Sequence, residues 1–253
     1  MTRVTAIVNQ KGGVGKSTTA INLATYLAQR GEKVLIADLD AQANATSGLG
    51  VSAEERGCMY DVLLDGRPLE EVAVQTSVEN LQVAPSTINL VGAEVELVSE
   101  LAREFKLKRA LDKLPEGEYT KVLLDCPPSL DLLTLNALAA ADEVLIPIQC
   151  EYYALEGLTQ LMRSIRMVRE ELNPGLQIGG VLLTMFDART NLSHQVADEV
   201  RAFFGDRVFS AAIPRNVRLS EAPSFGQPIS LYAPQSTGAE AYSAVAEEVL
   251  HRG

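Results

Sequence analysis

The chain has 253 residues, of which 47% are hydrophobic and 22% are charged, and its formal net charge is −11 at pH 7. Read as a whole-chain average, this charge argues against a nucleic-acid binder, although an average can hide a basic patch. Three widely spaced cysteines (Cys58, Cys126 and Cys150) argue against disulfide, zinc and iron–sulfur sites. No apolar run approaches the roughly 20 residues that span a bilayer, and nothing before Val4 is long enough for a signal peptide. We therefore expect a cytoplasmic protein whose residues 1–253 form a single domain.

A glycine-rich loop joins the first predicted strand to a helix that begins near Lys16. Its glycines let successive N–H groups turn inward around an anion, and the start of the helix adds its positive dipole end. Lys16 can reach the β- and γ-phosphates of a nucleotide, and the Ser17 hydroxyl can bind Mg²⁺. The loop departs from the general Gly-x-x-x-x-Gly-Lys-Ser/Thr pattern, because Gln10 stands where the first glycine belongs and a second lysine, Lys11, follows it.

The extra lysine needs a partner, because burying an unpaired ammonium is costly. Residues 11–17, Lys-Gly-Gly-Val-Gly-Lys-Ser, resemble the deviant Walker A loop of the ParA/MinD family of P-loop ATPases. In that family the first lysine reaches across a dimer interface to the nucleotide of the other subunit. The resemblance implies a homodimer that encloses two ATP molecules with Mg²⁺, with Lys11 acting in trans. The loop residues that would bind the nucleotide are Lys11, Gly12, Gly13, Val14, Gly15, Lys16, Ser17 and Thr18.

The second predicted strand begins at Val34 and ends in two carboxylates, Asp38 and Asp40. In a parallel sheet the carboxyl ends of the strands share one edge, so both side chains should lie beside the phosphate loop. One could help to organise the metal shell, and the other could orient the attacking water. In the family the second aspartate is tied to hydrolysis, which assigns that role to Asp40 and leaves Asp38 as a candidate metal ligand or an ordinary strand end.

Residues 44–120 carry weaker signals. We predict helices at 59–64 and 93–105 with a strand at 81–84 between them. The alternating charges between Glu94 and Arg109 are typical of a solvated helical face, with a partner surface as the alternative.

A strand at 121–125 then delivers Asp125 to the edge of the sheet, before the rigid turn of Pro127 and Pro128. This stretch resembles the family's Walker B strand, in which the aspartate holds Mg²⁺ through a water. The loop that the two prolines begin could sense the γ-phosphate.

The second half continues the alternation of strands and helices. Arg163, Arg166 and Arg169 share one face of a predicted helix that ends near Leu172, as a solvated face or part of a DNA or partner surface. The stretch 149–158 resembles the ParA branch of the family more than the MinD branch. We predict helices at 132–141, 192–204 and 237–250, and strands at 143–149, 178–185 and 207–213.

Residues 214–226, Pro-Arg-Asn-Val-Arg-Leu-Ser-Glu-Ala-Pro-Ser-Phe-Gly, are highly characteristic of the chromosomal ParA branch, also called Soj. The resemblance implies that Met185, Pro214 and Asn216 border the adenine. It also implies that Arg189 and Arg218 contact DNA without sequence preference. His194 is expected to be an exposed helix residue.

Taken together, these patterns predict an α/β fold of the P-loop NTPase type, with one doubly wound, mostly parallel sheet flanked by helices. The resemblance implies a Mg²⁺-dependent ATPase for chromosome or plasmid segregation. Its ATP-bound dimer would bind double-stranded DNA at the nucleoid, and a ParB-type partner would stimulate hydrolysis and release. A MinD-like membrane-associated ATPase is the main alternative, but the acidic final helix predicts no membrane anchor. A metabolic or cofactor-maturation ATPase is the third.

Overall fold

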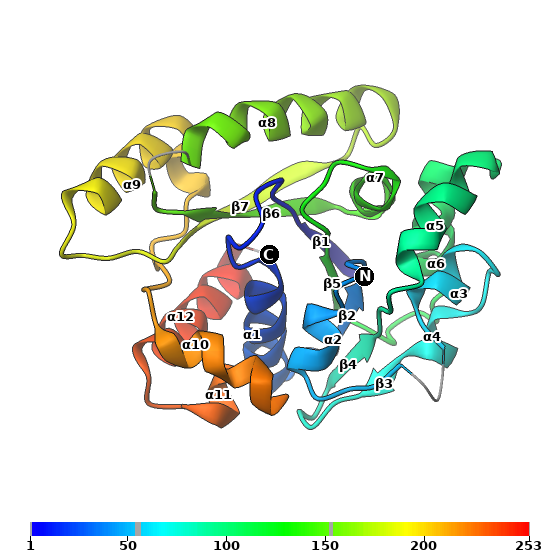
Figure 1. Cartoon of the computed structure of the whole chain (residues 1–253), viewed down its shortest axis with the longest axis horizontal. Helices are drawn as coiled ribbons and strands as arrows, with labels where there is room; N and C mark the ends of the chain where they lie inside the picture. The colour runs from blue at the N-terminus through cyan, green and yellow to red at the C-terminus, as the bar shows by residue number, and fades with distance from the viewer. Residues whose placement is uncertain (1, 54–56, 152–153, 253) are drawn as a thin grey trace.

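The computed structural model describes residues 2–53, 57–151 and 154–252, so residues 152–153 of the stretch 149–158 lie outside the description. The described chain forms a seven-stranded sheet in the order β3-β4-β2-β5-β1-β6-β7 (Figure 1). All neighbouring strands pair in parallel except β3 and β4, which confirms the predicted mostly parallel sheet. The strands are β1 (Arg3–Ile7), β2 (Val34–Asp38), β3 (Val74–Gln75), β4 (Leu81–Ala84), β5 (Lys121–Asp125), β6 (Glu143–Gln149) and β7 (Gln177–Thr184).

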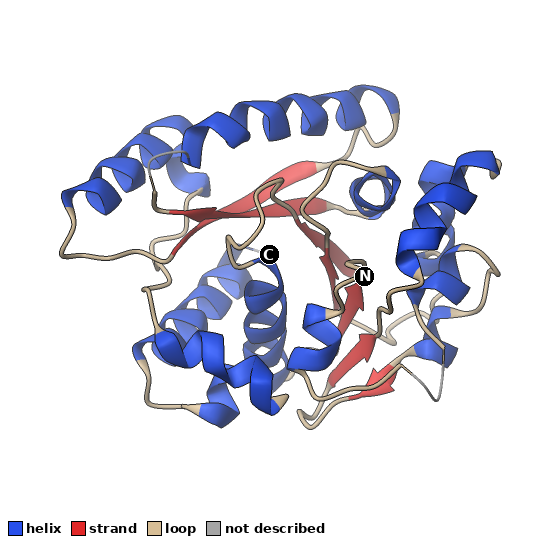
Figure 2. Cartoon of the chain, viewed as in Figure 1, coloured by secondary structure: helices blue, strands red, loops and turns tan. Residues whose placement is uncertain are grey.

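Helices cover both faces of the sheet, as Figures 1 and 2 show. One face carries α7, α8 and α9, and the other carries α1, α10, α11 and α12. The helices are α1 (Lys16–Gln29), α2 (Asn44–Gly48), α3 (Met59–Leu63), α4 (Leu69–Val72), α5 (Leu90–Glu96), α6 (Lys106–Leu111), α7 (Leu132–Ala140), α8 (Ala154–Glu171), α9 (Asn191–Phe204), α10 (Val217–Glu221), α11 (Ile229–Tyr232) and α12 (Thr237–Arg252).

Alternation of side chains along each strand builds two cores, one on each face. In β5, Val122 and Leu124 join the core that contains Leu133 of α7. Leu123 points the other way and packs in the core that contains Leu23 of α1. Because both faces are covered, the strands read as nearly continuous apolar runs, which is why the sequence identified them.

The predicted helix at 93–105 is wrong in its extent. The structure has α5 at Leu90–Glu96, a 3₁₀ turn at Leu97–Ser99, a second turn at Arg103–Phe105 and then α6. Glu100 is extended and Ala102 has a φ of +49°, a left-handed conformation that ends the helical path. The alternating charges between Glu94 and Arg109 continue across this break, so the sequence did not indicate that the helix ends there.

The predicted strand at 207–213 is also wrong. The segment meets its neighbours only at separate points: bridges join Val181 to Val208 and Phe186 to Pro214, and the N–H groups of Phe209 and Ile213 donate to the Val181 and Leu183 carbonyl oxygens at 2.9 and 2.8 Å. The backbone N–H groups of Ser210 and Ala211 instead donate to the carboxylate of Glu248 on α12, both at 2.8 Å. A side chain far along the chain therefore interrupts the pairing with β7 at Ser210 and Ala211.

Within the described residues, no helix has the length and apolar character needed to cross a bilayer.

Candidate functional site

The phosphate loop lies at the carboxyl edge of the sheet, between β1 and α1. Gly13 and Gly15 have φ values of +76° and +92°, which side-chain-bearing residues rarely adopt, so both glycines are required by the path of the loop. The Thr184 hydroxyl, at the end of β7, donates to the Val14 carbonyl oxygen at 2.8 Å. The loop thus presents the free N–H groups at the start of α1 to an anion.

Lys16 begins α1 and is only 6% exposed. Its Nζ donates to the Lys11 carbonyl oxygen at 3.3 Å. Burial lowers the pKa of Lys16, while the negative charges of Asp125 and Asp40 oppose that shift. The ammonium is therefore held inside the loop, among carboxylates, where a phosphate would meet it.

Asp125 ends β5 and is completely buried, and neither of its carboxylate oxygens has a hydrogen-bond partner. Burial first, and then the charge of Asp38, raise the pKa of Asp125 well above its ordinary value. The nearby Ser17 hydroxyl and the charge of Lys16 partly oppose that rise. A buried carboxylate without partners is costly, and it fits a site completed by a hydrated cation between Ser17 and Asp125.

Asp38, the last residue of β2, and Asp40, two residues later, make different contacts. Asp38 Oδ2 accepts hydrogen bonds from the Thr46 N–H at 2.9 Å and from the Thr46 hydroxyl at 2.7 Å, while Oδ1 accepts from the Asp40 N–H at 3.2 Å. Burial raises the pKa of Asp38 to about 6. Asp38 thus ties α2 to the end of β2. Asp40 Oδ1 accepts a hydrogen bond from the Gln42 N–H at 3.0 Å.

The deviant lysine is engaged within its own protomer. Lys11 Nζ forms an ion pair with Glu151, and both side chains are a little over one-third exposed. The Lys11 N–H donates to Asn9 Oδ1 at 3.0 Å, and Asn9 Nδ2 donates to the Pro147 carbonyl oxygen at 2.7 Å. Nearby in sequence, the Gln10 Nε2 group is buried without a hydrogen-bond partner. The loop therefore contains a buried side-chain donor, the Gln10 amide group, without a hydrogen-bond partner.

A cavity of about 510 Å³ lies beside the loop, and it contains the three residues expected around the adenine, Met185, Pro214 and Asn216. Gly15 and Thr18 line its other wall. Met185 has a φ of +50°, which is unusual for a residue with a side chain, and the bridge between Phe186 and Pro214 brings the two segments together. The structure thus brings these residues to one cavity beside the phosphate loop.

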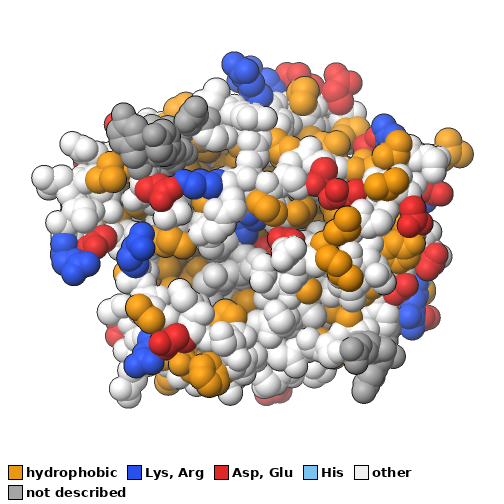
Figure 3. Space-filling model, in the orientation of Figure 1, with side chains coloured by type: hydrophobic (Ala, Val, Ile, Leu, Met, Phe, Trp, Pro, Cys, Tyr) orange, Lys and Arg blue, Asp and Glu red, His pale blue; other side chains and the backbone are white. Residues whose placement is uncertain are grey.

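The two arginines expected to contact DNA lie on the β7–α9 loop and on α10. Arg189 forms a two-point ion pair with Asp187, with a shortest distance of 2.7 Å, and Arg218 pairs with Glu221 at 2.8 Å. Arg215 lies close enough to Asp187 to help lower the pKa of that carboxyl. Figure 3 shows basic side chains along the left rim of this face, over the region of α9 and α10.

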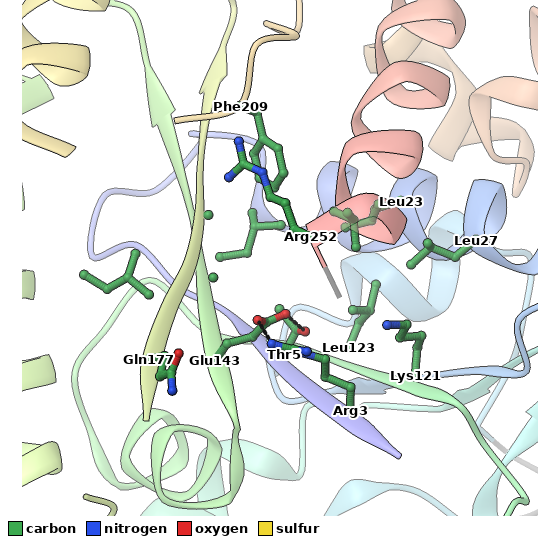
Figure 4. A pocket seen from close by; sticks show the side chains of 15 residues that line it. Arg3, Thr5, Leu23, Leu27, Lys121, Leu123, Glu143, Gln177, Phe209 and Arg252 are labelled. Atoms are coloured by element: carbon green, nitrogen blue, oxygen red, sulfur yellow. Dashed lines mark hydrogen bonds and ion pairs between the residues drawn. The ribbon is translucent and has the colours of Figure 1, made fainter. Parts of the chain in front are cut away.

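A second cavity, of about 170 Å³, lies at the amino edge of the sheet, opposite the phosphate loop (Figure 4). Its Glu143 carboxylate accepts from Arg3 at 2.9 Å and from Thr5 at 3.0 Å. Arg252 lies over the Phe209 ring, 4.3 Å from its centre. These contacts tie β1 to β6 and the end of α12 to the sheet.

Sequence reasoning missed several residues that shape the site. Thr184 supports the loop, Glu151 holds Lys11, and the buried Tyr242 hydroxyl lies 3.1 Å from the hydroxyl of Thr19. Each comes from a segment more than 100 residues from its partner, so no local spacing could reveal it. The expected exposed position of His194 is confirmed.

Comparisons with known proteins agree with this geometry. The AAA domain family matches residues 2–178. The chain is 56% identical over 254 residues to the sporulation initiation inhibitor protein Soj of Bacillus subtilis (strain 168), with 100% of both proteins covered. It is 55% identical over 251 residues to the chromosome partitioning protein ParA of Myxococcus xanthus, with 99% of this chain and 88% of that protein covered.

Among solved structures, cobyrinic acid a,c-diamide synthase from Mycobacterium smegmatis, with bound ATP analogue and magnesium, matches with a TM-score of 0.86. It is 38% identical, with 99% of this chain and 95% of that chain covered. The similarity to both partitioning proteins extends over essentially the whole chain. The chain therefore belongs to the ParA/Soj family of chromosome-partitioning ATPases.

Proposed function

We propose that this protein is a partitioning ATPase that binds ATP with Mg²⁺, closes into a homodimer on DNA, and leaves the DNA after hydrolysis. The observation that carries the proposal is the buried Asp125 carboxylate, which has no hydrogen-bond partner and lies near Lys16 and Ser17. Such a group is expensive to keep unless a cation and its ligands complete the site. The solved relative that holds an ATP analogue and magnesium supports this choice of ligands.

Each residue of the site has a proposed role. Residues 11–18 would surround the phosphates, with Lys16 neutralising the β- and γ-phosphates in cis. Ser17 would bind the metal directly and Asp125 would hold it through a water, while Asp38 positions the loop more than it binds metal. Mg²⁺ would neutralise phosphate charge that develops during transfer. Asp40 would orient the attacking water.

Dimerisation follows from the position of Lys11. In this protomer its ammonium is paired with Glu151. A phosphate across a dimer interface carries more charge than one carboxylate, so nucleotide would draw Lys11 from Glu151 to the partner's site. Because the closed dimer binds ATP better than the free protomer does, the nucleotide sets the fraction of dimer.

We further propose that the dimer presents Arg189 and Arg218 to the DNA backbone, with Arg215 beside them. Both arginine side chains are exposed and their carboxylate partners are partly exposed, so each ion pair is weak and a phosphate can replace the carboxylate at small cost. A ParB-type protein would stimulate hydrolysis, and the protein would reside on the nucleoid. Helix α12 carries Glu240, Glu247 and Glu248, so we propose no attachment to anionic lipid.

DNA binding tests the proposal. With an uncleavable ATP analogue, the wild type should bind duplex DNA of any sequence, and its affinity should fall steeply with salt. Arg189→Ala combined with Arg218→Ala should make the slope of log K against log salt shallower by about 4 per dimer, because each of the two protomers loses two phosphate contacts. Arg30→Ala, at the far end of α1, is the matched control. An unchanged slope would remove both arginines from the DNA surface, and turnover indifferent to DNA would favour a metabolic ATPase.

A further inference from the structure

Five aliphatic side chains form an exposed stripe along α5 and the turn that follows it. They are 56–88% exposed, and they account for five of the eleven large apolar side chains that are exposed in the described chain. Figure 3 shows apolar and acidic side chains mixed on the right of this face, where Figure 1 places α5. The members of this α5 stripe are Ile88, Val91, Val95, Val98 and Leu101.

The spacing of the stripe shows that α5 has a second apolar face, which is exposed to solvent. Ile88, Val91 and Val95 are separated by three and four residues, so they share one side of the helix. The opposite side is already used, because Leu90 and Ala93 are buried in the core. A helix that is apolar on both sides is typical of one covered on both sides.

Carboxylates surround the stripe. The Tyr60 hydroxyl donates to both oxygens of Glu96, at 3.1 and 2.9 Å, and this hydrogen bond is the main cause that raises the pKa of Tyr60, with smaller contributions from burial and from the charges of Glu96, Asp65 and Asp61. On the other side, burial and a contact with Asp131 raise the pKa of Glu94 to about 7.

The first two basic residues that follow the stripe are paired. Lys106 pairs with Glu100 at 2.6 Å, and Arg103 pairs with Glu104 at 3.0 Å. The rim beside α3 and α7 therefore remains acidic. A second copy docked symmetrically on this face would set carboxylates against carboxylates, whereas a basic partner would find complementary charge.

We propose that the α5 stripe is the docking site for an amphipathic segment whose aliphatic side chains are interleaved with lysine or arginine. The inference rests on the proposed function, because it assigns the segment to the ParB-type partner. Aliphatic contacts would supply most of the affinity, and the acidic rim would favour fast association.

The stripe is linked to the catalytic loop by short contacts. Ser86 precedes the stripe by two residues, and its hydroxyl donates to the Asp40 carbonyl oxygen at 2.6 Å. The Ser86 N–H donates to the Thr46 hydroxyl at 3.0 Å, and that hydroxyl donates to Asp38. A partner that shifts α5 therefore also shifts the backbone of Asp40. Ser86 is thus a positioning residue, which connects docking to the orientation of water by Asp40.

Binding of the purified ParB-type protein from the same organism tests the docking site. The association is measured by fluorescence anisotropy with labelled ParB, in the presence of Mg²⁺ and an uncleavable ATP analogue. Val95→Ser combined with Leu101→Ser should weaken binding about tenfold or more, because both side chains are exposed and would be covered by the partner. Met167→Ser, at a similarly exposed position of α8, should bind as the wild type does.

The outcomes distinguish a failure of the docking-site proposal from a failure of the proposed function on which it rests. Weakened ParB binding with normal dimerisation and DNA binding supports the proposal. Normal ParB binding by the double variant overturns the docking site and leaves the ATPase proposal intact. Loss of dimerisation in the double variant would assign the stripe to a second copy and overturn the partner assignment. If the wild type itself neither dimerises nor binds DNA, the proposed function fails.

A second variant tests the link to hydrolysis. Ser86→Ala should bind ParB as tightly as the wild type, yet the ratio of ParB-stimulated to unstimulated ATP turnover should fall severalfold. A ratio equal to that of the wild type would show that the contact between Ser86 and Asp40 does not transmit docking.

Discussion

Replacing Asp125 with asparagine tests whether the apo protein holds a destabilised group in readiness for a cation. The carboxylate is completely buried and has no hydrogen-bond partner, and a buried unsatisfied polar group costs about 1–3 kcal/mol. Asparagine keeps the shape and removes the charge that Asp38 opposes. Among the described residues no ion pair joins Lys16 to Asp125, although some attraction to Lys16 would be lost. The asparagine amide would also lack partners, so only the additional cost of a charged over a neutral unpaired group is removed, and the metal-free variant should be more stable than the wild type by about 1 kcal/mol.

Thermal unfolding with and without Mg²⁺ and ADP measures two quantities: the stability of the metal-free protein and the stabilisation that the ligands add. In chelator, Asp125→Asn should melt about 2–4 °C above the wild type, as expected for 1 kcal/mol in a chain of this size. Ligand at 100 times its Kd stabilises a protein by about 2.7 kcal/mol, and the variant should lose the part that depends on Mg²⁺. Asp206→Asn, an exposed change, should alter neither value. A metal-free variant less stable than the wild type would refute the reasoning, as would an unchanged response to Mg²⁺.

Three further changes test other parts of the site. Glu151→Gln should free Lys11 and tighten ATP-dependent dimerisation by up to about fivefold for each exposed ion pair, and so by up to about 25-fold for the two pairs of a dimer; sedimentation showing no change would contradict this. Asp40→Ala should bind ATP normally while turnover falls at least about 100-fold, and normal turnover would place water orientation elsewhere. The pKa of Glu94 lies near 7, above its ordinary 4.5, so its protonated form stabilises the fold below pH 4.5 and this contribution fades as pH rises toward 7. In urea unfolding, the stability of Glu94→Gln relative to the wild type should thus rise between pH 5 and pH 8. A difference in unfolding free energy that stays constant over this range would exclude the raised pKa of Glu94.

Local chemistry explains why much of this molecule could be read from its sequence. The strands at 81–84 and 143–149 were predicted with the bounds that the structure has, because both are buried apolar runs with clear ends. The loop glycines, Lys16 and Asp125 could be placed together because the carboxyl ends of parallel strands meet at one edge. These inferences needed only neighbouring residues and one rule of topology.

The remaining features depend on contacts between distant segments. Glu248 accepts hydrogen bonds from the backbone N–H groups of Ser210 and Ala211 and so interrupts the strand expected at 207–213, and Glu151 pairs with Lys11 from 140 positions away. The helical path breaks at Ala102 because its backbone is left-handed, and an alanine in the sequence does not indicate that conformation. Likewise, the charge pattern between Glu94 and Arg109 gave no sign that an aliphatic stripe would stay exposed beside it.

The oligomeric state under nucleotide control tests the central claim most directly. Sedimentation velocity should give a monomer with Mg²⁺ and ADP, and a dimer with Mg²⁺ and an uncleavable ATP analogue. Lys11→Ala should remain monomeric in both conditions while still binding nucleotide through Lys16. A wild-type protein that stays monomeric when saturated with the analogue would contradict the claim, and so would a Lys11→Ala variant that dimerises as well as the wild type.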